Sequence, residues 1–245
     1  MKIQCGTKPP SYKIRVPPPA KDQATWWIAN LQACKENSRI PDQRSMESMS
    51  TIKVYTDATG GDAGRIKNGI GGFCPPSNWF YMPWPELIRS NRPNSDGIQF
   101  AHKMCSLEGI AALVGLAGIP DLAKNKEFHK LCDNSAFVAV YRKKHSSCPY
   151  AYTVAKALYD VGIGLGTVVK VIKTRRCSSI GEDVADALSK GHWEHAWSQM
   201  PNKNEDSSRI PAAILKWISN PVKDMNLGYK ILKDMMMYTK VLYLE

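Results

Sequence analysis

The sequence predicts an α/β fold in which a mixed five-stranded sheet is flanked by helices. Two observations lead to this class. The first three strand candidates follow one another closely, as antiparallel strands joined by tight turns do, and helices then alternate with strands, as parallel strands require. The predicted order is three strands, a helix, a strand, two helices, a strand and a helix. Antiparallel pairing therefore opens the sheet and parallel pairing completes it.

The three opening strands are marked by apolar and β-branched residues between turn signals. The first begins at Thr51 and stops at the turn formed by residues 56–61 (Thr-Asp-Ala-Thr-Gly-Gly). The second and third, residues 70–73 and 79–82, are separated by Pro-Pro-Ser-Asn and are predicted to form a hairpin. A polar, proline-containing loop is expected over residues 85–95.

The remaining elements alternate between helical and strand periodicity. An apolar stripe at helical spacing predicts a helix from Phe100 to about Gly118. Strands are predicted at residues 128–132 and 167–173, and helices at residues 135–144, 150–161 and 181–190.

The chain divides into three parts by composition. Residues 1–50 form a basic, proline-rich leader with a short amphipathic helix at residues 22–35 and a polar linker, and residues 51–192 form the α/β domain. Residues 193–245 form a C-terminal helical extension, in which two helices broken around Pro221 suggest a packing or dimerising surface.

Composition limits the classes of function. The 245 residues are 43% hydrophobic and 22% charged, as in globular proteins, with neither a membrane-length apolar run nor a signal-peptide core. The seven cysteines form no Cys-x-x-Cys pair and are read as reduced thiols of an intracellular protein, in the cytoplasm or nucleus. A net charge of +11 favours an acidic partner, and nucleic acid fits it best.

Four carboxylates stand at informative places. Asp57 and Asp133 end the first and fourth predicted strands, Asp186 lies in a late helix, and Glu108 lies inside the first long helix. Each aspartate alone has a structural explanation in a turn or helix cap. Glu108 fits such an explanation least, because its helical neighbours are apolar or small and a carboxylate on that face needs a cation or a donor.

Clustered carboxylates repel one another unless cations lie between them. If the first and fourth strands are adjacent, Asp57 and Asp133 meet at one edge of the sheet, and Glu108 and Asp186 approach from flanking helices. Magnesium, which prefers carboxylate and water oxygens, is the expected ion. Two such ions would promote hydrolysis of a phosphodiester.

These four positions lie in blocks that resemble a known family. Val-Tyr-Thr-Asp-Ala-Thr-Gly (54–60), Ser-Leu-Glu-Gly-Ile-Ala-Ala-Leu (106–113), Leu-Cys-Asp-Asn-Ser (131–135) and Val-Ala-Asp-Ala-Leu-Ser-Lys (184–190) are similar, in order, to the active-site blocks of the ribonuclease H domain of retroelement reverse transcriptases. The last block is especially like those of long-terminal-repeat and tyrosine-recombinase retrotransposons. The resemblance covers residues 51–192, and the Trp26-Trp27 segment looks like the connection that precedes that domain.

The resemblance implies a ribonuclease H-like sheet and cleavage of the RNA strand of RNA–DNA hybrids. It implies that two Mg²⁺ ions, with Mn²⁺ as an alternative, are held by four carboxylates: Asp57, Glu108, Asp133 and Asp186. It also implies that Thr59, Gly60, Asn134 and Ser135 lie near the RNA strand, and that the polymerase domain of a parent element is a possible partner. Charge separately marks Arg142, Lys143 and Lys144 as a candidate contact with the hybrid.

The chain departs from the family in three ways. Residues 175–182 lack the histidine that many members carry after the last strand, the segment between Phe80 and Phe100 is long, and no polymerase or integrase motif is present. An exonuclease would place a second acid two residues after the first, where this chain has Thr59, and an integrase would have its helical glutamate last in order, whereas Glu108 is second. The alternative from another class is a catalytically silent nucleic-acid-binding module of domesticated retroelement origin.

Overall fold

The computed structural model describes residues 49–60, 69–100, 103–175, 179–200 and 210–242, together with positions 21, 24, 25 and 28. The chain divides into two units, residues 1–37 and 38–245, and the second holds all the elements described below. The four described positions near the N-terminus are helical, and the rest of the predicted helix at residues 22–35 lies outside the described residues.

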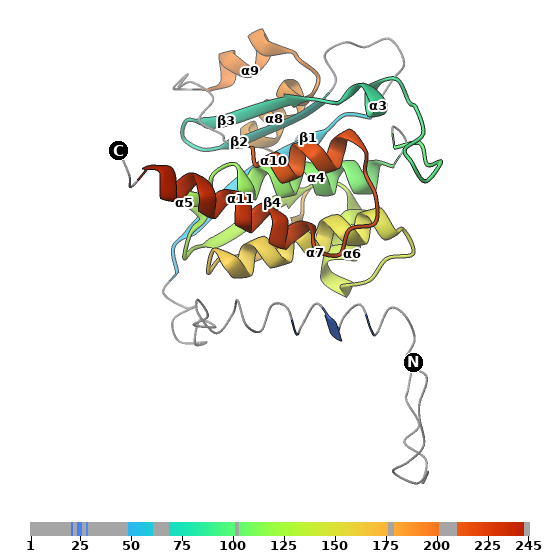
Figure 1. The fold of residues 1–245 in the computed structure, drawn as a ribbon. Coiled ribbons are helices and arrows are strands. Elements are labelled where there is room, and N and C mark those ends of the chain that lie inside the picture. The colour runs from blue at the N-terminus through green and yellow to red at the C-terminus, as the bar shows by residue number, and fades with distance from the viewer. Residues whose placement is uncertain are drawn as a thin grey trace, which may run out of the picture. The chain divides into compact units, whose positions relative to one another are not determined.

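Five strands form one mixed sheet (Figure 1). They are β1 (Thr51–Ala58), β2 (Gly69–Cys74), β3 (Asn78–Pro83), β4 (Glu127–Cys132) and β5 (Val168–Lys173), in the order β3-β2-β1-β4-β5. The β1–β2 and β2–β3 pairs are antiparallel, and the β1–β4 and β4–β5 pairs are parallel. This topology confirms the predicted class and is consistent with the ribonuclease H-like fold.

The helices that connect and cover these strands are α3 (Glu86–Arg89), α4 (Met104–Ala117), α5 (Pro120–Ala123), α6 (Ser135–Lys143), α7 (Pro149–Gly164), α8 (Ile180–Ser189), α9 (Trp193–Gln199), α10 (Ala212–Ser219) and α11 (Leu227–Leu242). In the described part of the chain no helix has both the length and the apolar character needed to cross a membrane.

The two faces of the sheet carry different helices. Val54 and Thr56 of β1 point toward α4, where Gly115 lies close to both side chains. Tyr55, between them in the strand, points the other way and lies against Gly181 of α8. The larger hydrophobic core fills the α4 face, and a smaller apolar cluster lies between α8, α9 and the hairpin.

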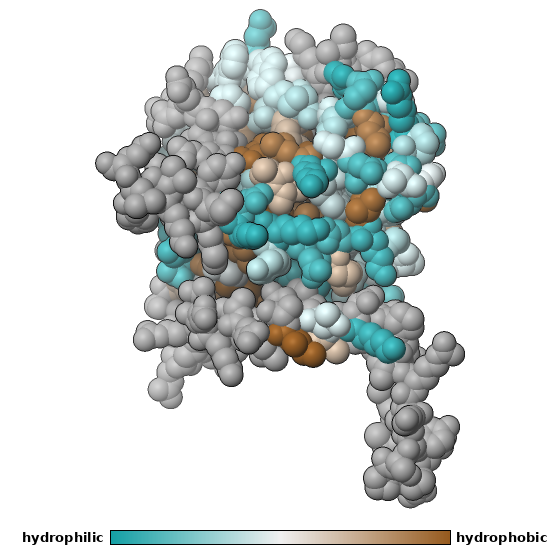
Figure 2. All heavy atoms as spheres, in the orientation of Figure 1, coloured by the Kyte–Doolittle hydropathy of each residue, from teal (hydrophilic) through white to brown (hydrophobic). Residues whose placement is uncertain are grey.

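The C-terminal helices pack onto the α4 side of the molecule. Helix α11 contacts α7, and α10 contacts α11. The ring of Trp217 in α10 meets that of Phe100 edge to face at 6.5 Å. The face shown in Figure 2 is mainly hydrophilic, with apolar side chains in small separate patches.

Local structure differs from the prediction at several places. Helix α4 begins at Met104 because Phe100 belongs to a preceding turn, in which its carbonyl accepts the Lys103 N–H. The loop expected at residues 85–95 contains the short helix α3, and the short helices α5 and α9 were not predicted. Both helices expected around Pro221 are present as α10 and α11.

Candidate metal centre

The parallel pairing of β1 with β4 brings two aspartates to one edge of the sheet. Tyr55 is the register partner of Leu131. Asp57 lies two residues further along β1, and Asp133 follows the end of β4 two residues after Leu131, and so the two side chains leave the sheet side by side.

Glu108 reaches the same place from α4. Its residue is only 3% exposed, because it lies on the helix face that packs against the sheet. One carboxylate oxygen from each of Asp57, Glu108 and Asp133 lies within 4.8 Å of the other two. The structure therefore brings together three of the four predicted ligands, which we call the carboxylate triad.

Asp186 lies beside this triad rather than within it. It lines a shallow pocket at the end of the sheet, whose walls are Tyr55, Thr56, Asp57, Leu131, Asp133, Glu182, Ala185 and Asp186. Its carboxylate lies 2.6 Å from the ammonium of Lys190, one helical turn further along α8. Asp186 therefore faces the same pocket as Asp57 and Asp133 while being paired with a lysine.

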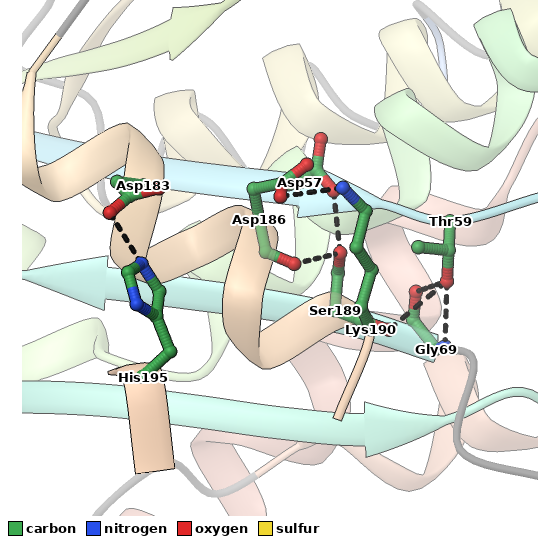
Figure 3. Close-up of polar contacts among 8 residues, drawn as sticks. All are labelled: Asp57, Thr59, Gly69, Asp183, Asp186, Ser189, Lys190 and His195. Carbon is green, nitrogen blue, oxygen red and sulfur yellow. Dashed lines mark hydrogen bonds and ion pairs between the residues drawn. The ribbon is translucent and has the colours of Figure 1, made fainter. Parts of the chain in front are cut away.

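A glycine in β2 sets the position of α8. Gly71 is the register partner of Asp57, and a Cβ there would lie 2.5 Å from the carbonyl oxygen of Ala185 and from the amide nitrogen of Ser189. Helix α8 can thus lie directly on the strand. The hydroxyl of Ser189 then donates a 2.6 Å hydrogen bond to Oδ2 of Asp57 (Figure 3).

Burial dominates the electrostatics of the triad. It raises the pKa of Glu108 from an ordinary 4.5 to about 8, an effect that the charge of Lys130 partly offsets and that Asp57 and Asp133 increase. Burial also raises the pKa of Asp57, while the Ser189 hydrogen bond lowers it. Oε2 of Glu108 is buried and has no hydrogen-bond partner among the described residues.

A divalent cation fits this donor set. Three carboxylates that each place an oxygen within 4.8 Å of the other two repel when ionised, and hard cations such as Mg²⁺ take carboxylate oxygens as ligands. The Glu108 carboxylate accepts a backbone hydrogen bond from Ala58, but its buried Oε2 lacks the second donor or cation that would offset the cost of burial.

Two residues that the sequence analysis did not single out support this centre. Ser189 lies within the last sequence block but was given no role of its own. Its contact with Asp57 joins two residues that are 132 positions apart in the chain. Lys130 is completely buried in β4. The sequence could have indicated this burial, because side chains alternate between the two faces of a strand and Lys130 shares the inward face with Phe128 and Cys132.

The predicted hybrid-binding residues fall into two groups. Thr59 and Asn134 have structural partners: the Thr59 hydroxyl donates to the carbonyls of Gly69 and Ser189, and the Asn134 side chain accepts from Phe137 N–H as the N-cap of α6. Gly60 lies directly after Thr59 at the end of β1, half-buried, and Ser135 is exposed as the first residue of α6.

The basic cluster ends α6. Arg142 and Lys143 are exposed, and Lys144 adopts a left-handed conformation with φ of 52°. The Lys144 ammonium lies over the rings of Tyr141 and Tyr159, at 4.0 and 4.2 Å from their centroids. Part of this cluster therefore also packs against the domain.

A histidine follows the last predicted block at some distance. His195 in α9 lies 2.7 Å from Asp183 and joins α9 to α8 (Figure 3). It comes after α8 and not in the segment between β5 and α8.

Comparisons with protein families, with curated proteins and with solved structures found no match for this chain.

Proposed function

We propose that this chain is a metal-dependent phosphodiester hydrolase of the ribonuclease H type, which cuts the RNA strand of RNA–DNA hybrids. Asp57, Glu108 and Asp133 hold the divalent cations, with Asp186 facing them from α8. Mg²⁺ is the proposed ion, and Mn²⁺ is the expected substitute.

One observation carries the proposal. The Glu108 carboxylate is buried, has one oxygen, Oε2, without a hydrogen-bond partner among the described residues, and places a carboxylate oxygen within 4.8 Å of two aspartates at the end of the sheet. The backbone hydrogen bond from Ala58 offsets only part of the cost of burying this acid and leaves Oε2 unpaired. Its position is accounted for when a cation binds there.

The residues of this chain would divide the work of the reaction. Bound divalent ions would polarise the scissile phosphate and provide a nucleophilic hydroxide. Glu108 approaches from beneath the sheet edge, while Asp57 and Asp133 line the pocket from which a phosphate would enter. Ser189 holds the Asp57 carboxylate in one orientation.

The choice of substrate is supported by charge and by the resemblance of the four blocks. The domain at residues 51–192 carries 18 basic and 12 acidic residues. Four of the acidic residues are the three proposed ligands and Asp186, so the rest of the surface is strongly basic. Ser135, two residues after Asp133, is exposed beside the triad. Contact of such residues with 2′-hydroxyl groups would distinguish RNA from DNA.

Cleavage of a labelled RNA–DNA hybrid in the presence of Mg²⁺ tests the proposal. The parent chain should cut the RNA strand, while Asp133→Asn and Glu108→Gln should abolish cleavage and leave hybrid binding intact. Asp121→Asn, which changes an exposed aspartate of α5, is the matched control and should cut like the parent.

Three results would contradict this function. Undiminished cutting by Asp133→Asn would show that the triad does not take part in the reaction. Equal cutting of duplex DNA would show that the enzyme is not specific for RNA–DNA hybrids. Hybrid binding without cleavage by the parent chain, with either Mg²⁺ or Mn²⁺, would support the catalytically silent binding module.

A further inference from the structure

Lys130 occupies a position where a strand normally carries an apolar residue. It is fully buried, on the inward face of β4, which lies between β1 and β5, and its register partners are Val54 of β1 and Val171 of β5. Fully buried lysines are rare unless a specific partner is present.

The partners of Lys130 lie at the foot of the carboxylate triad. Its ammonium donates to the carbonyl oxygen of Thr56, the residue before Asp57, and to that of Leu131 at 2.6 Å. Carbonyl oxygens only accept hydrogen bonds and thus suit a group that only donates. The positive charge is fixed between the ends of the two strands that carry Asp57 and Asp133.

The charge of Lys130 acts on the ionisable groups that lie close to it. Burial raises the pKa of Glu108, of Asp57 and of the Cys132 thiol, and the charge of Lys130 offsets part of this rise in all three groups. In a medium of low dielectric constant such an interaction is much stronger than at the surface.

The triad and Lys130 together carry a net charge that one divalent ion balances, and Glu182 is a further acid on the pocket wall. The three ionised carboxylates carry −3, and Lys130 reduces this to −2. Asp186 is neutralised by Lys190 at 2.6 Å. Lys173, which donates to the Asp133 carbonyl, is exposed, and its charge is screened by water.

We infer that Lys130 is a built-in counter-cation of the metal centre, which limits the free protein to one divalent ion and weakens the binding of that ion. This inference rests on the proposed function, since it assumes that the triad binds metal. A second ion would enter only together with the negative charge of a substrate phosphate. Lys130 is a positioning residue in this role, because it touches backbone carbonyls and neither metal nor substrate.

Calorimetric titration of the metal-free protein with Mg²⁺ tests the inference. We would work at pH 9, above the pKa of about 8 of Glu108, so that protons compete little with the metal. Lys130→Met has a similar length without the charge, and Lys130→Gln keeps an N–H donor for the Thr56 carbonyl. Lys53→Met, at an exposed position of β1, is the matched control.

The parent should bind one Mg²⁺ per chain. Both Lys130 variants should bind Mg²⁺ about 10-fold more tightly, or take a second ion, because a nearby positive charge has been removed. Lys53→Met should behave like the parent, and Glu108→Gln should lose binding.

The outcomes separate the two claims. Equal affinity and stoichiometry in the parent and both Lys130 variants, with loss in Glu108→Gln, would overturn the role of Lys130 and leave the metal centre standing. Binding only by the Lys130 variants would support the counter-cation and contradict a resident metal in the parent. No binding by any variant would overturn both.

A measurement on the parent chain covers the case in which neither Lys130 variant folds. In protein labelled with ¹⁵N-lysine, less than one equivalent of Mn²⁺ should broaden the ammonium signal of Lys130 before that of Lys53. An unaffected Lys130 signal, while Mn²⁺ binds, would place the ion elsewhere and overturn the inference.

Discussion

Burying Glu108 has an energetic cost that depends on pH. Its pKa is about 8 in the folded, metal-free protein and 4.5 ordinarily, because burial disfavours the charged form. Between these two values the unfolded chain has released the proton and the folded chain has not. The unfolded state thus binds fewer protons, and the contribution of Glu108 to the free energy of unfolding falls as pH rises through this window.

Replacing Glu108 by Gln should remove this dependence. In EDTA, the variant should be more stable than the parent at pH 8, by an amount on the order of 4 kcal/mol at most, and the difference should shrink at pH 5. Urea unfolding at the two pH values measures it, with Asp121→Asn as the control for loss of a surface charge. A constant difference between pH 5 and pH 8 would show that Glu108 does not titrate in this window.

The residues of the triad could be predicted from the chain, but their supports could not. Asp57 and Asp133 were identifiable because strand ends of a parallel pair share an edge, and Glu108 because its helical neighbours are apolar. The role of Lys130 depends on the Thr56 carbonyl, 74 residues away in the chain. Ser189 and Asp57 are 132 residues apart, and no local pattern reports such a contact.

At the scale of elements, the site depends on how closely α8 lies on β2. The strand is buried along its whole length, and Gly71 leaves the space that the backbone of α8 occupies. The same helix carries Asp186 to the pocket and Ser189 to the Asp57 carboxylate. A change in the distance between helix and strand would therefore move both residues relative to Asp57.

Gly71→Ala should displace α8. Its Cβ would meet backbone atoms, which cannot rotate away, and the expected loss is about 1–3 kcal/mol of unfolding free energy together with a lower cleavage rate. Gly164→Ala is the control, because its Cβ would meet only the flexible end of the Leu232 side chain, far along the chain from the site. Unfolding curves and hybrid cleavage that match the parent would contradict the importance of this close approach.

The elements themselves were more predictable than their boundaries. All five strands, and α4, α6, α7 and α8, follow from periodicity and turn signals. Phe100 was assigned to α4 because its spacing fits the helical stripe, whereas the structure shows that it is buried by Tyr150 and Trp217. An apolar residue at this position is expected both in a buried helix face and in a loop that packs into the core, so the sequence alone cannot tell the two apart. The short helices α3, α5 and α9 have too few residues for a periodic pattern to form.

At the scale of the molecule, the C-terminal helices are tied to the domain through polar and aromatic contacts. Asn94, in the loop after α3, donates to the carbonyl of Pro221 and accepts from the amide of Ile98. Trp217 packs on Phe100 and donates to the Val222 carbonyl at 2.8 Å. Residues beyond 192 thus complete the core on the α4 side.

Trp217→Ala should destabilise the protein by about 3–5 kcal/mol, because it removes a large buried side chain from the contact between α10 and Phe100. Leu215→Ala, in the same helix at an exposed position, should cost little. Chemical unfolding compares the two variants. Equal small losses would show that α10 does not contribute to the main core.

The net charge of +11 should govern how the whole molecule meets a hybrid. Replacing Arg142, Lys143 and Lys144 by Gln should weaken hybrid binding regardless of sequence and reduce its salt dependence by roughly 0.9 log unit per lost phosphate contact. The control replaces three exposed lysines of the C-terminal helices and their connection, Lys216, Lys223 and Lys233, by Gln. If both triple variants respond to salt in the same way, the α6 cluster is not a specific contact surface.

The strand order also has a consequence for the order of events when the chain is made. The central pair joins Thr51 to Glu127, so that the hairpin and α4 must be synthesised before β1 can meet β4. Pairing over such a distance in the chain slows folding. Asp57 and Asp133 therefore come together late, and Ser189 reaches them later still. A growing chain therefore carries the separate parts of the centre long before residue 189 has emerged and the centre can assemble.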